Sequence, residues 1–501
     1  MIARPCASCR RAARAGKRLL VAACFGAVLG ACSVGPRYAV PQAPAAPAYK
    51  EIGPVSHRGA DDGAWQPAQP QDGARKGKWW EVFAEPELDG LEDRLNIDNQ
   101  SIAQYFQNFL AARAQLQAAR AGFFPTVSTN PSFARNGQGS AAATTGAGAA
   151  VAGGVRTTHN LVTLPFDASW EPDLWGRIAS TLREYQFAAQ VSAADLENLR
   201  LTEQANLAVF YFELRGQDAL QDLYDRTVDA DRSALAYARA QSATGIGNDE
   251  AVAQAEITLE NAEVAGIGIA ADRAVYEHAI ATLIGQPASN FGLAVRDLAT
   301  PMPAIPIGVP SQLLQRRPDI AAAERQLART NAAAGVAAAA YYPSLVLTGG
   351  AGFESRSVAS LLALPALFWS LGASATETLF DGGLRSANTA QATANYNSAV
   401  AAYRQTVLSA MEQVEDSLAT VRVLSRQLAR QESAVAAARR YLSIATSRYQ
   451  AGLDPYLNVI NAQTTLLGDE QTLITLRVSE LTAATQLIQA LGGGWDVAQL
   501  P

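Results

Sequence analysis

The stretch YQAGLDPYLNVINAQ, residues 449–463, decides the fold of this chain. Upstream of it, residues 385–451 contain neither glycine nor proline, so a single long helix can continue as far as Gly452. Pro455 then suits the first turn of a new helix, where its missing N–H group costs little. The stretch therefore predicts two long helices that are joined by a tight turn.

An earlier stretch, GIGNDEAVAQAE at residues 245–256, repeats this pattern of a glycine turn followed by a helix. Gly245 and Gly452 are 207 positions apart. The same spacing relates four further pairs, which are Val252 and Val459, Ala255 and Ala462, Gly176 and Gly383, and Gly285 and Gly492. A single register that links all of these pairs predicts an internal duplication.

The composition narrows the possible functions. The chain has 501 residues, of which 49% are hydrophobic and 17% charged, and its formal net charge is −6. This mild acidity argues against nucleic acid as a partner, because nucleic acid requires a basic patch. His57, His159 and His278 are scattered without the spacing of metal ligands, so we expect no metal site. The sequence has no Ser/His/Asp or Cys/His pattern, and we expect no enzymatic activity.

The N-terminus resembles a bacterial lipoprotein signal. Basic residues precede a short apolar run at residues 19–29, which is too short to span a bilayer. Leu29-Gly30-Ala31-Cys32 then resembles a lipobox, which implies that residues 1–31 are removed and that Cys32 carries diacylglycerol and palmitate. The alternative is an ordinary signal peptide followed by an incidental cysteine. After cleavage Cys32 is the only cysteine that remains, so no disulfide is expected.

Strand-like segments occur once in each half. Residues 162–171 alternate strictly between apolar and polar side chains, as a strand between an apolar and a polar environment does. With residues 126–133 they predict a first hairpin over about 124–172, and residues 344–353 and 368–380 predict a second over about 344–380. The spacing from Pro125 to Pro343 is 218 positions, so the second hairpin is shorter by 11 residues.

Each hairpin leads into a helical segment of 67 residues, 178–244 in the first half and 385–451 in the second. Apolar residues from Val400 to Leu428 recur every 3.5 residues on average, which is the spacing of a coiled coil, so we expect these helices to pack side by side. An intracellular coiled-coil rod is the alternative, but it leaves the signal, the hairpins and the duplication unexplained.

No uninterrupted apolar run long enough for a membrane helix follows the signal. A membrane-spanning part must then consist of strands, and strands in lipid must close into a barrel. Four strands are too few to enclose a pore, whereas three chains would supply twelve, in the apolar-out, polar-in pattern of outer membrane proteins.

The chain resembles the outer membrane factors of tripartite efflux pumps, the TolC-like family, and within it the NodT-like lipoproteins of resistance-nodulation-division systems. The resemblance covers nearly the whole mature chain. Its motifs are Cys32-Ser-Val-Gly-Pro-Arg-Tyr38, Trp79-Trp80 with Phe83, the run from Trp170 to Arg177, the run from Leu313 to Ile320 with Glu324, Phe380-Asp-Gly-Gly383, and the two glycine turns.

The resemblance implies a mainly helical fold with a β membrane part. A homotrimer would form a twelve-helix α-barrel continuous with a twelve-stranded antiparallel β-barrel, anchored in outer membrane lipid and extending into the periplasm. The parts of the chain would be the signal peptide 1–31, a lipidated extended segment 32–85, a first repeat 86–286, an equatorial linker 287–310, a second repeat 311–492 and a tail 493–501. The loops 137–158 and 354–367 would face the exterior.

The turns, with tips at residues 245–250 and 452–457, would meet a periplasmic adaptor and, through it, an inner-membrane resistance-nodulation-division transporter. We assign this contact to Gly245, Gly247, Gly452 and Tyr449. The resemblance implies a passive exit duct for drugs or toxic organic molecules, without any cofactor beyond the lipid. An exit duct for type I protein secretion and a periplasmic scaffold without a pore remain as alternatives.

The periplasmic gate departs from the family pattern. Relatives carry aspartates six and nine residues beyond the second glycine, where this chain has Asn458 and Asn461. Some relatives also pair an aspartate six residues past the first glycine with an arginine two past the second, and here Ala251 and Asp454 take those places. We therefore expect a gate closed by packing and neutral hydrogen bonds. The alternative is that Asp249 or Asp454 supplies the acidic ring.

Two further motifs have competing interpretations. Gly266 and Gly268 begin a GxGxxA match to a dinucleotide-binding motif, but a helical pattern rather than a strand precedes them, which favours close helix packing. Arg316-Arg317 would suit an anion, yet Asp319 and Glu324 nearby favour a structural ion network.

Overall fold

The computed structural model describes residues 34–43, 46, 48–51, 77–138, 157–245, 249–303, 305 and 316–494. The chain divides into two compact units. The first unit comprises Met1–Ala39, Ala111–Ala189 and Gln326–Ala399, and the second comprises Val40–Leu110, Gln190–Arg325 and Val400–Pro501.

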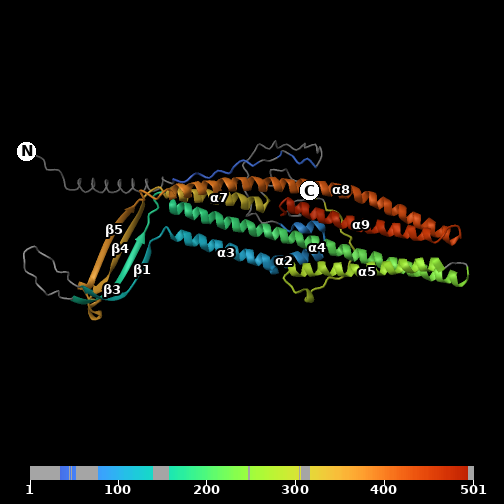
Figure 1. The fold of residues 1–501 in the computed structure, drawn as a ribbon, viewed down its shortest axis with the longest axis horizontal. Helices are drawn as coiled ribbons and strands as arrows, with labels where there is room; N and C mark the ends of the chain where they lie inside the picture. The colour runs from blue at the N-terminus through green and yellow to red at the C-terminus, as the bar shows by residue number, and fades with distance from the viewer. Residues whose placement is uncertain are drawn as a thin grey trace, which may run out of the picture. The chain divides into compact units, whose positions relative to one another are not determined.

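One antiparallel sheet dominates the first unit (Figure 1). Its strands are β1 (Thr126–Thr129), β2 (Ser132–Gln138), β3 (Thr157–Trp170), β4 (Ser344–Ser355) and β5 (Leu367–Thr376). They pair in the order β1-β3-β4-β5, and β2 also pairs with β3. In a single chain the sheet is open, with β1 and β2 along one edge and β5 along the other.

Two strand boundaries differ from the prediction. The expected strand 126–133 is divided into β1 and β2, which pair with successive parts of β3, because Pro131 between them has no N–H group to donate. The expected strand 368–380 ends at Thr376. The residues after it instead place Asp381, whose carboxylate accepts backbone N–H groups at the start of the next helix.

Helices form most of the remaining described chain. They are α2 (Pro86–Asp98), α3 (Gln100–Ala121), α4 (Arg177–Ala243), α5 (Asp249–Leu283), α7 (Pro318–Ala339), α8 (Leu384–Gln450) and α9 (Leu457–Ala490), with short 3-10 turns η1 (Trp79–Phe83), η2 (Ala288–Asn290), η4 (Val358–Ser360) and η5 (Leu364–Ala366). Helices α4 and α8 have 67 residues each, and their first residues are 207 positions apart, in agreement with the duplication.

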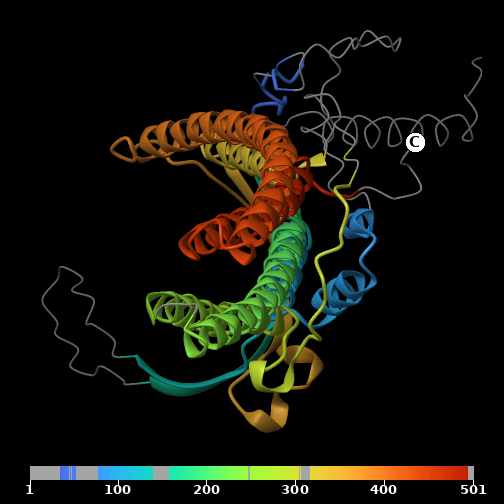
Figure 2. The ribbon, with the colours of Figure 1, turned by 90° about the vertical axis from the view of Figure 1, so that its right-hand side faces the viewer.

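In the second unit α4 lies beside α5, and α8 lies beside α9 (Figure 2). The pair Arg239–Glu256, at 2.7 Å, links the first two helices, and Arg439–Glu470, at 2.6 Å, links the other two. Residues of the predicted heptad series in α8, among them Tyr403, Val407, Val414 and Leu418, are buried. The side-by-side packing expected from their spacing is thus observed.

Three apolar clusters form the core of the second unit. In the first, Trp79, Trp80 and Phe83 of η1 pack with side chains of α2, α4, α5 and α9. In the middle of α4, a Cβ atom on Gly216 would lie 2.5 Å from a Val478 methyl group, so only glycine permits this approach of α9. The third, the tip cluster, consists of Val228, Leu235, Ala238, Ala255, Leu259, Ala262, Tyr456 and Val459.

Part of the expected extended segment 32–85 packs against helices. Ala43 and Tyr49 are buried in the second cluster, with residues of α8 and α9. The backbone N–H groups of Lys50 and Glu51 donate to the Glu415 carboxylate at 2.8 and 3.1 Å. These contacts fix residues 48–51 along α8.

Candidate functional site

The sheet of the first unit has two chemically different faces, because residues paired across neighbouring strands share a face. The apolar face includes Val127, Phe133, Leu164, Phe166, Trp170, Leu345, Leu347, Phe353, Leu367, Trp369 and Leu371. The polar face includes Thr126, Ser128, Ser132, Thr163, Asp167, Ser169, Thr348, Glu354, Ser370, Ser374 and Thr376. The alternation predicted for residues 162–171 therefore extends over much of the sheet, although Val346 and Phe368 lie on the polar face and Arg135 and Asn160 on the apolar face.

The apolar face is exposed in the single chain. Leu371 is 81% exposed, Trp369 74% and Val127 71%. Exposed apolar side chains that gather on one face of a sheet indicate contact with lipid or with another chain.

Aromatic side chains gather where the strands meet the helices. The Trp170 indole N–H donates to the carbonyl of Phe123 at 3.0 Å. Trp175 stacks on Tyr342, with ring centroids 4.9 Å apart, and its indole N–H donates to the carbonyl of Pro343 at 2.8 Å. Tryptophan and tyrosine are enriched at the boundary between lipid and water, where one end of the ring is apolar and the other hydrogen-bonded.

The first described residues after the expected lipidation site are fixed to the first unit. The N–H of Val34 donates to the carbonyl of Trp175 at 3.3 Å, and the Asn331 side chain donates to the carbonyl of Pro36 at 3.2 Å. A Cβ atom on Gly35 would lie 2.9 Å from the Cα of Gly335, so two glycines allow this crossing. Cys32 itself lies outside the described residues.

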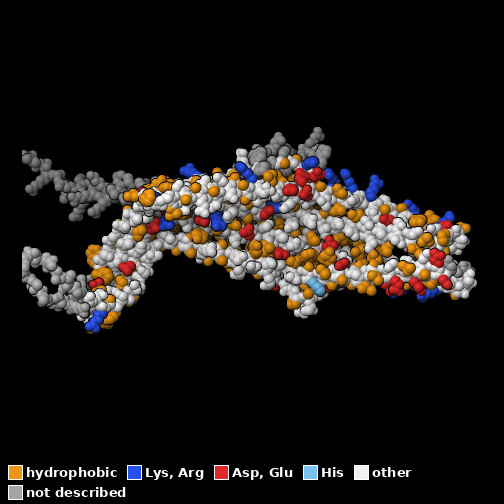
Figure 3. Space-filling model, in the orientation of Figure 1, with side chains coloured by type: hydrophobic (Ala, Val, Ile, Leu, Met, Phe, Trp, Pro, Cys, Tyr) orange, Lys and Arg blue, Asp and Glu red, His pale blue; other side chains and the backbone are white. Residues whose placement is uncertain are grey.

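The two glycine turns have the same backbone geometry. Gly245 has φ +73° and Gly452 has φ +70°, and open space surrounds the position of a Cβ atom at each. Gly247 lies outside the described residues. Near these turns, acidic side chains follow α5 and basic ones follow α8 (Figure 3).

Tyr449 connects the two helix pairs just before the second turn. Its hydroxyl donates to the Gln241 side chain of α4 at 2.7 Å. Its ring lies 6.0 Å from that of Tyr237 and 5.1 Å from that of Tyr456. Tyr449, a residue of α8, thus links this helix to α4, and the rings of Tyr237 and Tyr456 cover part of its ring.

The acids near the expected gate are held by local partners. The Arg448 side chain donates to Asp454 at 2.6 Å, and this hydrogen bond holds the pKa of the Asp454 carboxyl below its usual value. Asp249 accepts a hydrogen bond from the Ser242 hydroxyl at 2.9 Å. Asn458 hydrogen-bonds to Asp454, whereas Asn461 is exposed.

Ala251, the remaining residue assigned to the gate, is half-buried beside the tip cluster. Its methyl side chain has no charge with which to complete the lock of relatives, as the sequence predicts. Sequence reasoning missed Arg448, although an arginine six residues before an acid across a glycine turn is a recognisable pattern.

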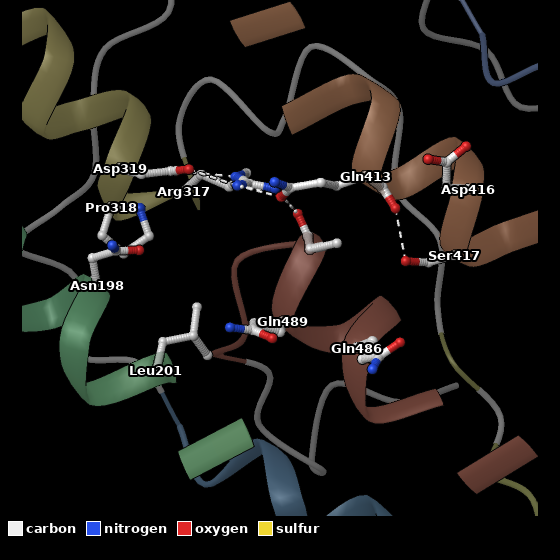
Figure 4. A pocket seen from close by; sticks show the side chains of 11 residues that line it. Asn198, Leu201, Arg317, Pro318, Asp319, Gln413, Asp416, Ser417, Gln486 and Gln489 are labelled. Carbon is white, nitrogen blue, oxygen red and sulfur yellow. Dashed lines mark hydrogen bonds and ion pairs between the residues drawn. The ribbon is translucent and has the colours of Figure 1, made fainter. Parts of the chain in front are cut away.

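Arg317 lies at the centre of a polar network in the second unit (Figure 4). Its guanidinium donates to the Asp319 carboxylate at 2.6 Å, to the Gln413 side chain at 2.9 Å and to the carbonyl of Ala490 at 2.9 Å. These groups border a cavity of about 350 Å³. With these partners in place the guanidinium is occupied by the protein itself, which supports the interpretation as a structural ion network. Glu324, the other acid of this motif, pairs with Arg325 at 2.6 Å.

The GxGxxA motif lies in the middle of α5, with no strand before it. A Cβ atom on Gly266 would make ordinary contacts of 3.7 Å with Gln221 and Tyr224 of α4, which supports the packing interpretation. Among the described residues, no cluster of His, Cys, Asp and Glu side chains could hold a metal ion.

Within the described ranges, no helix is both long and apolar enough to cross a membrane.

The sequence profile of the outer membrane efflux proteins matches residues 93–286 and 309–493, which is more than half of the chain. The chain therefore belongs to this family of TolC-like efflux proteins, and its place in the cell is the outer membrane. It is 30% identical to the toluene efflux pump outer membrane protein TtgC of Pseudomonas putida, over 96% of each chain. It is 29% identical to the pyoverdine export outer membrane protein OpmQ of Pseudomonas aeruginosa, over 84% of this chain and 88% of OpmQ.

A solved structure gives the same result for the fold. The outer-membrane channel OprN superposes with a TM-score of 0.81 at 28% sequence identity, covering 93% of this chain and all of that chain. CusC, at 23% identity and a TM-score of 0.80, shares the fold. The family is one of efflux channels and not one of enzymes.

Proposed function

We propose that three copies of this chain form the outer membrane exit duct of a tripartite efflux pump, which conducts small organic molecules passively from the periplasm to the exterior. The observation that carries the proposal is the exposed apolar face of a sheet whose opposite face is polar. In a barrel the first face would contact lipid and the second would line an aqueous channel.

The open edges of the sheet support a trimer. A lipid-exposed edge would leave the N–H and C=O groups of β5 and of β1 without partners, which is prohibitive in hydrocarbon. Pairing of β5 with β1 and β2 of a second copy removes both edges. Because β1 and β2 pair with successive parts of β3, they count as one strand position, and three copies supply twelve such positions. Helices α4, α5, α8 and α9 of the three copies would then supply the twelve-helix α-barrel of the family.

The proposed duct would meet its partner proteins at its periplasmic end. The turns at Gly245, Gly247 and Gly452, together with Tyr449, would contact a periplasmic adaptor that connects the duct to an inner-membrane resistance-nodulation-division transporter. Relatives named for toluene and for pyoverdine export support small organic cargo rather than protein. The transport is passive, so the chain itself performs no catalytic step.

Lipidation at Cys32 would add a second attachment to the membrane. Residues 34–36 are held beside Trp175. A lipid on Cys32 would therefore stay close to the end of the sheet where Trp170 and Trp175 lie. Metabolic labelling with palmitate should mark the wild type and not Cys32→Ser. Equal labelling of the two would contradict lipidation, while leaving the duct itself unaffected.

A matched pair of substitutions on neighbouring residues of β5 tests the duct. Leu371 belongs to the apolar face and Ser370 to the polar face. A lysine in place of Leu371 would meet lipid, at a cost of about 2–4 kcal/mol near the bilayer midplane, whereas a lysine in place of Ser370 would meet water.

The readouts are the yield of membrane-inserted protein and the conductance in planar bilayers. We expect Leu371→Lys to insert poorly, and Ser370→Lys to insert normally with its ion selectivity shifted toward anions. Normal insertion of both variants, or wild-type protein that inserts without conducting, would contradict the duct and favour a scaffold.

A further inference from the structure

Helices α4 and α9 pack in an antiparallel register that two contacts define. Gly216 of α4 lies against Val478 of α9, and the Gln471 side chain of α9 donates to the Tyr224 hydroxyl of α4 at 2.6 Å. Advancing along α4 therefore corresponds to moving back along α9. Counting 15 residues on from Gly216 and 15 back from Val478 leads to Asp231 and Gln463.

The tip cluster supports the same register. Asp231 lies on the buried line of α4 between Val228 and Leu235. Gln463 lies one helical turn beyond Val459, on the side of α9 that enters the cluster. The register thus places an acid and an amide opposite each other in an apolar surrounding.

Each of these two side chains has a buried oxygen without a hydrogen-bond donor. Within the described residues, neither Oδ2 of Asp231 nor Oε1 of Gln463 has a partner, and both atoms are hidden from solvent. Asp231 as a whole is only 3% exposed. A buried acceptor without a donor destabilises the folded state, and where two such acceptors face each other a single proton between them satisfies both.

We propose that Asp231 is a proton-controlled latch between α4 and α9: its neutral carboxyl donates to Oε1 of Gln463, and its ionised form loses this bond and loosens the two helices beside the tips. Because the turn that begins α9 is the gate of the proposed duct, the latch deepens that function and depends on it for its physiological role. The contact itself does not depend on transport.

The electrostatic surroundings favour the neutral form of Asp231. Burial raises the pKa of its carboxyl to about 6. Burial and the charge of Asp231 raise the pKa of the hydroxyl of Tyr456, the residue before α9, and Tyr449 of α8 contacts the Tyr456 ring. Tyrosines are neutral in this pH range and supply no positive charge to hold a carboxylate.

The charged groups of the adjoining α4–α5 interface are paired elsewhere. Glu263 of α5 pairs with Arg232 at 2.8 Å, and Glu256 pairs with Arg239 at 2.7 Å. Both arginine side chains are about 60% exposed, so they point toward solvent. Since the folded-state pKa of Asp231 is raised, the latch is closed below about pH 6 and opens as the pH rises through that value.

Hydrogen–deuterium exchange of the full chain in detergent tests the latch directly. Peptides from the first turns of α9 are followed from about pH 5 to about pH 8, after correction for the intrinsic pH dependence of amide exchange. In the wild type we expect protection to fall with a midpoint near pH 6. In Asp231→Asn the side-chain amide donates at every pH, so protection should stay at its acidic level.

Asp229→Asn is the matched control, because Asp229 lies on the same helix with its side chain 79% exposed. It should retain the wild-type midpoint. Protection in the wild type that is constant or rises with pH would overturn the latch, as would an unchanged pH dependence in Asp231→Asn. The exchange readout needs no conductance, so its failure is distinguishable from failure of the proposed duct.

Discussion

Arg317 donates a hydrogen bond of 2.9 Å to the carbonyl oxygen of Ala490, the last residue of α9. In the first half of the chain Asn99 donates one of 2.8 Å to the carbonyl of Leu283, the last residue of α5. Leu283 and Ala490 are 207 positions apart, so the two repeats end equivalent helices in the same way with different side chains. A side-chain donor here satisfies a terminal carbonyl that has no partner within its own helix.

The side chains that bond the two helix ends, Arg317 and Asn99, should contribute differently to the stability of the protein. Arg317→Ala removes the charged partner of the partly buried Asp319 and the side-chain donor to the carbonyl of Ala490, and we expect a loss of about 3 kcal/mol. Asn99→Ala should cost about 1–2 kcal/mol, because only neutral hydrogen bonds are lost. Denaturant unfolding in detergent measures both, with Arg440→Ala at an exposed position of α8 as control. If Arg317→Ala unfolds at the same denaturant concentration as Arg440→Ala, the network contributes nothing.

Glu92 should make stability depend on pH. It is fully buried, and neither carboxylate oxygen has a partner among the described residues. Burial, with Asp89 and Asp93 nearby, raises the pKa of its carboxyl well above the usual 4.5. The contribution of the neutral Glu92 carboxyl to stability is therefore complete below its pKa in the unfolded chain. It is lost as the pH rises through its raised pKa in the folded chain.

Glu92→Gln should remove this loss, since glutamine stays neutral. At about pH 8 we expect the variant to unfold at a higher denaturant concentration than the wild type. At about pH 5 the difference between the two denaturant concentrations should be smaller. A wild type that gains stability relative to Glu92→Gln as the pH rises would show that the carboxylate has a partner in the assembled protein.

The second turn should tolerate asparagine but not tryptophan at position 452. Gly452 has a positive φ, which asparagine adopts more easily than other residues, and open space surrounds it. Gly452→Trp should abolish efflux by obstructing the adaptor, with trimer mass and conductance unchanged, whereas Gly452→Asn should remain active. Drug resistance of cells reports efflux. Full resistance with Gly452→Trp would show that the adaptor binds elsewhere.

The gate should lack a strong cation site in the wild type. Asn458 is neutral, and Asp454 is held by Arg448. Multivalent cations added from the periplasmic side should block single channels weakly, and Asn458→Asp should strengthen the block by creating an acidic ring in the proposed trimer. Strong block of the wild type that survives Asp454→Asn would place the gate at another level of the duct.

Local patterns were sufficient to predict much of the fold. The absence of glycine and proline before Gly452 predicted a helix whose observed bounds, Leu384–Gln450, differ from the prediction by one residue at each end. The alternation of residues 162–171 predicted which face of β3 is apolar. Both are properties of consecutive residues, and secondary structure follows them directly.

Contacts between distant segments were harder to predict from the sequence. The ion pair of Arg448 with Asp454 depends on how tightly the turn closes. The juxtaposition of Asp231 with Gln463 depends on the register of α4 against α9, which is set by the approach at Gly216. A single sequence shows neither an aspartate's burial nor the residue opposite it, so these groups became visible only in the folded chain.

The mass of the detergent-solubilised protein tests the central claim most directly, because the open sheet of a single chain cannot enclose a channel alone. Native mass spectrometry of the fraction that conducts in planar bilayers removes the contribution of detergent. The account predicts a complex of three times the mass of the mature chain. A monodisperse monomer that still conducts would contradict it.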